Sequence, residues 1–277
     1  MTCGPPHGPP PPEAVLTAFG LRSLALALPG GQGRSWRVGE TVLKPFDGQP
    51  IELDDLAALL ARVEQRADLR VSPPRRARDG SWVADGWSAW RHEPGRPVPG
   101  SWVHIVDVGR HLHEALRDEP DLPWRAARTD SWAVADRMAW GELDIPFLGP
   151  RLAGLLAARR PVAGRAQLAR ADLTGNVLFD EHLPPVVIDF SLYWRPPEYA
   201  SAVVVADALV FEEAGPEVIR LLGDQPDDGQ YLLRALLFRA VTARLRGETD
   251  EIVERAYGSA ADAVLSRLRR DGARTGS

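Results

Sequence analysis

The sequence predicts an α+β protein with two lobes, in which a small N-terminal antiparallel sheet with one main helix precedes a larger, mostly helical C-terminal lobe. Short β-like segments separated by glycine-bearing turns fill roughly the first third of the chain. From Trp102 onward, apolar residues recur at helical spacing. The stretch "GNVLFDEHLPPVVIDF" interrupts these helices with two short apolar runs on either side of a turn, which indicates a β-hairpin.

The first lobe is expected over residues 13–90, after a Pro/Gly-rich tail at 1–12 that is predicted to be disordered or extended. The helix over 51–67 is amphipathic, with apolar residues at 53, 56, 59, 60 and 63. The predicted elements are a helix at 13–19, strands at 24–28, 35–38 and 41–45, a glycine loop at 29–34, the helix at 51–67, and two strands around an Asp79-Gly80 turn.

The second lobe is expected over residues 91–277, and the Pro- and Gly-rich segment 90–101 is predicted to be a hinge. The apolar residues of the second lobe follow the helical period in six stretches. These stretches are 103–116, 129–141, 146–159, 196–214, 229–245 and 259–270.

Composition excludes several classes of protein. The chain has 277 residues, of which 44% are hydrophobic and 26% charged, as is usual for a globular protein. Its formal net charge of -5 gives no reason to expect a nucleic-acid partner. No apolar run is long enough to cross a bilayer, and the opening residues lack the pattern of a secretory signal, so we expect no membrane partner. Since Cys3 is the only cysteine, the sequence favours a reducing, cytoplasmic location.

Polar residues stand at the outer ends of the predicted hairpin. In an antiparallel hairpin the residue entering the first strand lies beside the residue leaving the second, so Asn176 and Asp189 are expected to converge. Asp172 lies four residues before Asn176. Such an oxygen set suits Mg²⁺, which completes its shell with water and phosphate oxygens. An acid outside the metal shell can accept the proton of an attacking hydroxyl, and we expect Asp172 to fill that role.

Two residue types occur once each. Among 33 basic residues only Lys44 is a lysine, and Asn176 is the only asparagine. Arginine is a poor substitute for lysine where a compact ammonium must fit. The survival of one residue of each type, inside a chemically coherent pattern, favours a functional role for both.

These motifs resemble the protein-kinase-like fold, and most closely the aminoglycoside phosphotransferase family of small-molecule kinases. The resemblance rests on Asp172-x-x-x-x-Asn176, the hairpin that ends in Ile188-Asp189, and the lysine of "TVLKPF", and it covers roughly residues 20–245 in the expected order. It implies that Asp172 is the catalytic base, that Asn176 and Asp189 are metal ligands, and that Lys44 holds the nucleotide phosphates.

The same resemblance implies ATP or GTP and Mg²⁺ as cofactors and a small, hydroxyl-bearing (or amine-bearing) molecule as substrate. Two further groups of residues are expected to bind the nucleotide through backbone groups, the first at the phosphates and the second at the adenine. They are Gly30, Gly31 and Gly33 in the glycine loop, and Ser88, Ala89 and Trp90 near the hinge, where packing is the alternative role of the tryptophan. Glu52 is the first choice for the helix acid that pairs with Lys44, and Asp55 is the second.

The catalytic loop departs from the family pattern, because Arg170 replaces its histidine and Ala171 its glycine. The departure motivates an alternative function, a catalytically weak or inactive nucleotide-binding pseudokinase with a regulatory role. A protein-interaction or nucleic-acid module that uses the tryptophans and arginines is a third hypothesis, which the negative net charge disfavours.

Several other polar residues have predicted roles. His111 and His113 are two positions apart and therefore face different sides of a helix, which predicts surface histidines rather than a metal pair. Asp207 lies within an apolar helix and is expected to be buried, hydrogen-bonded and structural. Trp194 and Arg195 either face the acceptor substrate or, in the case of the arginine, pair with a surface acid.

Overall fold

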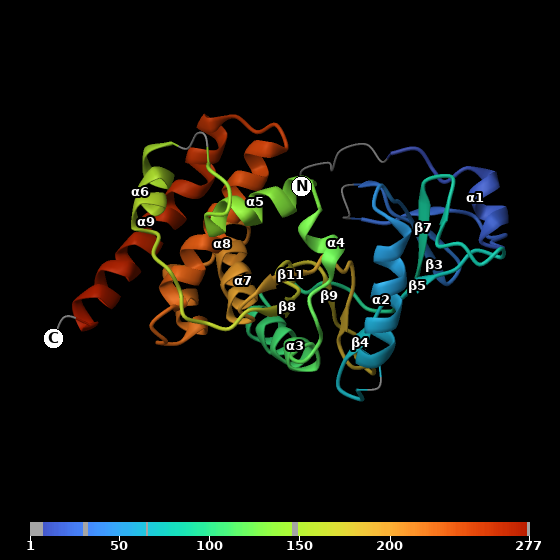
Figure 1. The fold of residues 1–277 in the computed structure, drawn as a ribbon, viewed down its shortest axis with the longest axis horizontal. Helices are drawn as coiled ribbons and strands as arrows, with labels where there is room; N and C mark the ends of the chain where they lie inside the picture. Colours follow the sequence, from blue (N-terminus) through green and yellow to red (C-terminus); the bar gives the residue numbers. More distant parts are fainter. Residues whose placement is uncertain (1–7, 30–32, 65, 146–148, 276–277) are drawn as a thin grey trace. The chain divides into compact units, whose positions relative to one another are not determined.

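The structure is a computed structural model that describes residues 8–29, 33–64, 66–145 and 149–275. The chain forms two compact units (Figure 1). The first contains the residues up to Val98 together with the segment Gly175–Phe190, and the second contains Pro99–Thr174 and the chain from Ser191 onward. The predicted α+β fold class is confirmed.

The first unit is built on an antiparallel sheet with the strand order β1-β2-β3-β7-β5, in which β6 also pairs with β7. Its strands are β1 (Leu26–Ala27), β2 (Trp36–Val38), β3 (Thr41–Pro45), β5 (Pro74–Arg75), β6 (Val83–Ala84) and β7 (Trp87–Arg91). In the central pair, Leu43 of β3 and Ala89 of β7 lie opposite each other in the core, and β7 is buried along nearly its whole length.

The predicted turn at Asp79-Gly80 is present, and the Gly80 N–H donates to the Ala77 carbonyl oxygen at 3.0 Å. Strands β5 and β6 do not pair around Asp79-Gly80, because both pair with β7 and lie one after the other along its edge. The hairpin turn into β7 is the second Asp-Gly pair, Asp85-Gly86, whose φ angles are 48° and 72°. Two consecutive positive φ angles match the twist of a tight two-residue hairpin, which asparagine, aspartate and glycine tolerate best.

Among the described residues, two α-helices complete the first unit, α1 (Glu13–Ala18) and α2 (Pro50–Val63). The N-terminus of α2 has a proline in its first turn and a capping box formed by Gln49 and Glu52. Its buried residues are the five predicted from the apolar spacing, namely Leu53, Leu56, Leu59, Leu60 and Val63.

The predicted β-hairpin is also present, and it belongs to the first unit. Strand β9 (Val177–Leu178) pairs antiparallel with β10 (Val186–Val187), with Val187 opposite Val177. On its other side β10 pairs in parallel with β4 (Arg70–Val71). Strand β10 therefore lies between β4 and β9, and the valines of the hairpin are buried.

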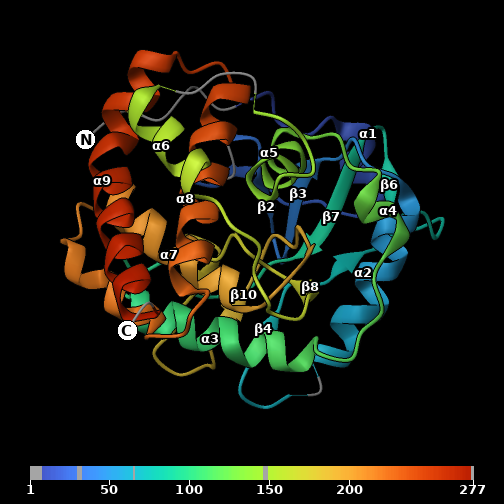
Figure 2. The same ribbon diagram turned by 60° about the vertical axis from the view of Figure 1, so that its left-hand side comes forward.

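The second unit is mostly helical (Figure 2). Its longer helices are α3 (Trp102–Ala115), α5 (Ser131–Trp140), α6 (Pro150–Ala158), α7 (Glu198–Phe211), α8 (Asp228–Leu245) and α9 (Asp250–Thr275), with a short α4 (Pro123–Ala126). Helix α8 packs against α5, α7 and α9 and is buried along most of its length, so it lacks the single apolar face of a surface helix.

A two-stranded ribbon lies beside these helices. It consists of β8 (Gln167–Ala169) and β11 (Tyr193–Arg195), with Leu168 opposite Trp194. Because β8 leads directly into the loop that carries Asp172, the ribbon positions this loop within the second unit. None of the helices within the described ranges is long and apolar enough to cross a membrane.

Candidate functional site

Lys44 and Asp189 meet in the first unit. The Lys44 Nζ atom lies 2.5 Å from Oδ1 of Asp189, although the two residues are 145 positions apart in the sequence. The ammonium also lies 4.5 Å from the ring centroid of Trp90 on the adjacent strand. Both charged side chains are partly exposed, so the ion pair contributes little to stability and is accessible to a ligand.

The backbone brings Asn176 close to Asp189. The N–H of Ile188 donates to the carbonyl oxygen of Asn176 at 3.0 Å, which continues the β9–β10 ladder by one residue beyond the strands. Asp189 then leaves the hairpin with a φ of 56°, in the left-handed region where residues other than glycine are uncommon. This conformation costs a non-glycine residue on the order of 1 kcal/mol of conformational free energy, and such outliers concentrate at functional positions.

The donor set at the open end of the hairpin fits Mg²⁺. Asn176 offers a carboxamide oxygen and Asp189 a carboxylate, and hard oxygen ligands in small number are what Mg²⁺ takes from proteins. Within the residues that the structure describes, there is no group of three or more His, Cys, Asp or Glu side chains that could hold a metal ion. The chemistry therefore suits a cation that keeps water or phosphate oxygens in its shell, rather than a closed zinc site.

The helix acids of α2 have other contacts. One Glu52 carboxylate oxygen accepts the backbone N–H of Gln49 at 2.9 Å as part of the helix cap. Asp55 lies in the first half of the same helix and is half-buried. The structure thus gives Lys44 an ion pair with Asp189, and gives Glu52 a capping bond.

The other residues predicted to bind the nucleotide lie in the glycine loop and in β7. Gly30 and Gly31 lie outside the described residues. Gly33 is buried with a φ of 68°, and its carbonyl oxygen accepts the N–H of Gly8 at 2.9 Å. The backbone of the buried segment 88–90 in β7 lies between β3 on one side and β5 and β6 on the other, so it takes part in the sheet. The segment comprises Ser88, Ala89 and Trp90.

In the second unit, Asp172, Arg239 and Asp207 form a network of ion pairs. Arg239 of α8 donates to Asp172 Oδ1 at 2.6 Å and, from two nitrogens, to the carboxylate of Asp207 on α7 at 2.6 Å each. Burial opposes the charged form of Arg239, yet the two carboxylates raise its pKa above the ordinary value. Burial raises the pKa of Asp207, and Arg239 opposes that rise.

Asp207 is buried and hydrogen-bonded, as predicted, and Arg239 links it to Asp172 in the loop after β8. Arg239 was not among the predicted site residues. The available signal was its position inside an apolar helical run, where a charge requires a partner.

His113 was predicted at the surface, and this prediction was wrong. Its side chain is buried, and its Nε2 atom accepts the backbone N–H of Arg170 at 3.1 Å. The adjoining Gln167 side chain donates to the His113 carbonyl oxygen at 2.7 Å, so α3 is bonded to both ends of the segment that leads to Asp172. Burial lowers the pKa of His113 to about 4, and the imidazole is therefore neutral.

The side chain of Arg170 is buried without a hydrogen-bond partner among the described residues. It is 1% exposed, and among the described residues its three guanidinium nitrogens have no hydrogen-bond partner. A buried charge without a partner destabilises the fold that holds it. The backbone of Arg170 is thus well anchored while its side chain is not.

Structural comparisons identify the class of fold. No protein-family model and no curated protein sequence matches the chain. Among solved structures, the aminoglycoside phosphotransferase from Alicyclobacillus acidocaldarius matches with a TM-score of 0.64 and 14% identity, over 97% of each chain. The microcompartment-associated aminopropanol kinase matches with a TM-score of 0.62 and 16% identity, over 95% of this chain and 97% of that one.

A third structure, an amicoumacin kinase in complex with AMP-PNP, Ca²⁺ and Ami, matches with a TM-score of 0.57 and 12% identity, over 92% of this chain and 90% of that one. Together these matches define a protein-kinase-like fold. Within that class, the fold of this chain is that of the small-molecule kinases related to aminoglycoside phosphotransferases.

His113 makes the stability of the protein depend on pH. The unfolded histidine binds a proton below about pH 6.5, whereas the folded one does so only near pH 4. The free energy of unfolding should therefore fall as the pH is lowered from 6.5 to 4, by roughly 3 kcal/mol from this residue. We expect His113→Gln, whose amide oxygen still accepts the Arg170 N–H, to lose that part of the slope in urea titrations at several pH values.

The matched control is His182→Gln, at an exposed position in the hairpin turn, which should keep the slope of the wild type. An unchanged slope in His113→Gln would show that His113 does not titrate as the structure indicates.

Removing the charge of Arg170 should stabilise the protein. We expect Arg170→Met to raise the free energy of unfolding by about 1–3 kcal/mol, because the substitution removes a buried guanidinium without breaking a hydrogen bond of its side chain. Arg239→Met is the control of opposite sign, since it leaves Asp172 and Asp207 without this counter-charge and should destabilise strongly. Chemical unfolding without ligand measures both, and a clear loss of stability in Arg170→Met would contradict the expectation.

Proposed function

We propose that the protein is a phosphotransferase that uses ATP or GTP with Mg²⁺ to transfer the γ-phosphoryl group to a hydroxyl (or amine) of a small molecule. One observation carries the proposal: the only lysine of the chain forms an ion pair with Asp189 at the open end of a hairpin whose first strand follows the only asparagine. The small-molecule-kinase fold supports it, and the named substrates of the matched structures are compounds of this size.

Each residue has a defined task in this proposal. Lys44 binds the phosphate oxygens of the nucleotide, and the carboxylate of Asp189 keeps its ammonium in place before the nucleotide arrives. Asn176 and Asp189 supply oxygen ligands to the cation, which when bound offsets the negative charge of the phosphates. Most of the rate enhancement then comes from positioning and electrostatics.

Asp172 orients the acceptor hydroxyl and accepts its proton. The ion pair with Arg239 places a positive charge beside this carboxylate and fixes its rotamer. A positioned carboxylate of this kind contributes typically about 10²–10⁴-fold to the rate.

A second candidate is a nucleotide-binding pseudokinase that regulates a partner. The buried guanidinium of Arg170, two residues before Asp172, favours it because a loop with an unpaired charge is less firmly held. Under this hypothesis the nucleotide and Mg²⁺ raise the melting temperature without any turnover, whereas sustained nucleotide consumption with a hydroxyl compound excludes it.

Asp172→Asn should separate catalysis from binding. We expect turnover to fall by about 10²–10⁴-fold while the nucleotide dissociation constant changes little, because the amide cannot accept the proton but stands outside the phosphate contacts. A screen of hydroxyl-bearing metabolites for nucleotide consumption supplies the substrate for this measurement.

The control for this substitution is Asp118→Asn, at an exposed position, which should behave as the wild type. Melting temperatures of both variants show whether the fold is retained. Wild-type turnover in Asp172→Asn would refute the role of this residue.

Asn176→Leu should remove the Mg²⁺-dependent part of nucleotide binding. At a nucleotide concentration of about 100 times the dissociation constant, binding stabilises a protein by about 2.7 kcal/mol. We expect the wild type to show a larger rise in melting temperature with ATP and Mg²⁺ than with ATP and EDTA, and Asn176→Leu to show the same smaller rise in both. An equal Mg²⁺ effect in variant and wild type would rule out Asn176 as a ligand.

A further inference from the structure

The Lys44 ammonium has an aromatic partner as well as a charged one. Within the part of the chain that the structure describes, it contacts the carboxylate of Asp189 and lies over the ring of Trp90, 4.5 Å from the ring centroid. An ammonium in this position is attracted by the negative face of the indole. Two different kinds of interaction therefore act on the same charge.

The register of β3 and β7 brings the ring and the ammonium together. Lys44 lies opposite Ser88, and Val42 lies opposite Trp90. Since alternate residues of a strand share a face, these four side chains stand on one face of the sheet. Lys44 and Trp90 are diagonal neighbours on that face, at a separation that long and aromatic side chains can bridge. The contact thus follows from the strand pairing.

The ring of Trp90 is firmly fixed. It is 5% exposed, and its Nε1 atom donates to the hydroxyl oxygen of the fully buried Ser88 at 3.0 Å. That hydroxyl donates to the Lys44 carbonyl oxygen at 3.4 Å. The backbone of Trp90 is also held on both sides, because it pairs with Val42 and with Pro74. The lysine side chain, which has four rotatable bonds, therefore rests on a rigid surface.

The ring and the carboxylate differ in what they do to the ammonium. Asp189 is also the proposed ligand of the cation, so its carboxylate is shared once the cation binds, and as a partly exposed ion pair it is screened by solvent. The ring of Trp90 is uncharged. It attracts the ammonium without neutralising it, which leaves the positive charge for a phosphate.

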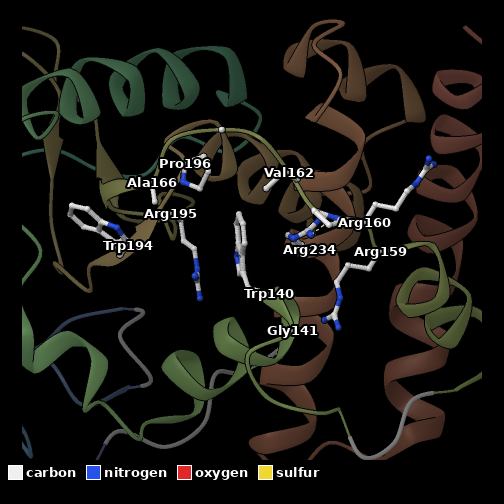
Figure 3. A pocket seen from close by; sticks show the side chains of 12 residues that line it. Trp140, Gly141, Arg159, Arg160, Val162, Ala166, Trp194, Arg195, Pro196 and Arg234 are labelled. Carbon is white, nitrogen blue, oxygen red and sulfur yellow. Dashed lines mark hydrogen bonds between the residues drawn. The ribbon is translucent and has the colours of Figure 1, made fainter. Parts of the chain in front are cut away.

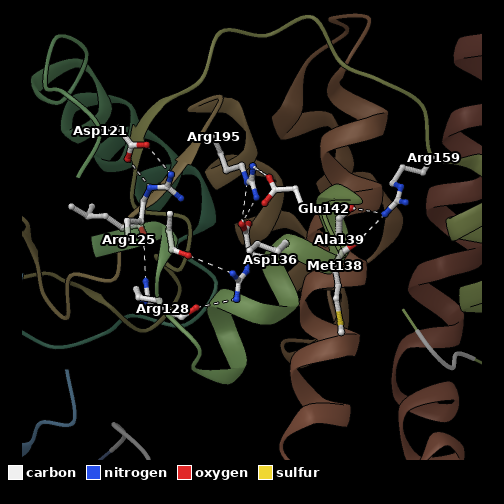
Figure 4. Close-up of polar contacts among 12 residues, drawn as sticks. Asp121, Arg125, Arg128, Asp136, Met138, Ala139, Glu142, Arg159 and Arg195 are labelled. Atoms are coloured by element: carbon white, nitrogen blue, oxygen red, sulfur yellow. Dashed lines mark hydrogen bonds and ion pairs between the residues drawn. The ribbon is translucent and has the colours of Figure 1, made fainter. Parts of the chain in front are cut away.

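Trp140 in the second unit shows a structural use of the same interaction. Its ring lies between Arg195 and Arg234, whose guanidinium carbons are 4.7 and 5.0 Å from its centroid (Figure 3). Both arginines are buried, and Arg195 also donates to Asp136 and Glu142 (Figure 4). The Lys44 side chain, in contrast, is 25% exposed, so its ammonium is accessible to a ligand while the ring holds it.

We propose that Trp90 is a positioning residue, which directs the Lys44 ammonium toward the phosphates of the nucleotide and keeps it there when Asp189 binds the cation. The benefit to phosphate binding rests on the proposed function, whereas the contact between ring and ammonium requires no nucleotide. A cation–π contact at a partly exposed site corresponds to about two- to fivefold in affinity.

NMR of the full chain without nucleotide tests the contact. Lys44 is the only lysine, so selective ¹³C labelling of lysine gives one set of side-chain signals. Protons over the face of an indole are shifted upfield by its ring current. We expect the Cε protons of Lys44 to lie upfield of those of free lysine, to stay there in Asp189→Asn, to shift less in Trp90→Phe and to lose the shift in Trp90→Leu.

Calorimetry with two ligands tests the consequence for phosphate binding. We expect Trp90→Leu to weaken the binding of ATP with Mg²⁺ about two- to fivefold and to leave that of adenosine unchanged, because adenosine has no phosphate for Lys44 to bind. In a Lys44→Met background, Trp90→Leu should cause no further loss, since the ring acts through the ammonium.

The matched control is Trp82→Leu in the same unit. Trp82 is 8% exposed, its indole N–H donates to Asp54 at 2.7 Å, and its ring lies 3.9 Å from the guanidinium carbon of Arg76. This variant also loses a buried indole and a cation–π contact, but it should keep the wild-type lysine signals and ATP affinity. Melting temperatures compare the folds of the two leucine variants, and Trp90→Phe and Asp189→Asn provide the test if Trp90→Leu does not fold.

Four results would overturn the proposal: unshifted lysine signals in the wild type, loss of the shift in Asp189→Asn, an equal loss of affinity for ATP and adenosine in Trp90→Leu, or a further loss of ATP affinity when Trp90→Leu is added to Lys44→Met. The first two are obtained without nucleotide. Expected lysine signals in a wild type that binds no ATP would instead overturn the proposed phosphotransferase function, so the two failures are distinguishable.

Discussion

The register of the β9–β10 pair is the constraint on which the candidate site depends. Val187 opposes Val177, and the next step of the ladder joins Ile188 to Asn176. A slip of one residue would turn every side chain of the hairpin to the opposite face. The parallel pairing of β10 with β4 and the burial of its valines exclude such a slip, because it would expose apolar side chains on one face and bury polar ones on the other. The apolar residues thus fix the register, and the register places the oxygen ligands.

Helix α8 carries two buried arginines, Arg239 and Arg234, whose partners differ in charge. Arg239 and Arg234 lie on the same helix, five residues apart, and both are buried. Arg239 contacts two carboxylates, and its role is to hold Asp207 and Asp172 in place. Arg234 donates only to neutral oxygens, and its guanidinium lies over the ring of Trp140. Because an uncompensated buried charge is costly, the fold depends on the carboxylates beside Arg239, whereas Arg234 relies on neutral oxygens and an aromatic ring.

Local patterns in the sequence predicted much of this structure, and contacts between distant segments explain most of what they missed. The spacing of leucines predicted the buried face of α2, and two valine-rich runs predicted the hairpin. The hairpin turn at Asp85-Gly86 was not predicted, because the pairing of β6 with β7 is what distinguishes it from the Asp79-Gly80 turn. Arg239 depends on residues far away in the chain, which no local period encodes. The pairing of Glu52 with Lys44 stays a prediction, and the structure shows Glu52 in the capping box of α2, three residues after Gln49.

His113 also bears on the replacement of the pattern's loop histidine by Arg170. The aminoglycoside phosphotransferase pattern that the sequence resembles has a histidine at the position of Arg170, and the resemblance implies that this histidine supports the loop. Here an imidazole reaches the same residue from α3 and accepts its backbone N–H, and burial keeps that imidazole neutral. Helix α3 lies close to the loop, because Leu173 packs against Gly109 and a Cβ at that glycine would come within 2.6 Å of it. The loop is therefore still supported by a histidine, but this histidine lies on α3. The side chain at position 170 is not needed for that support.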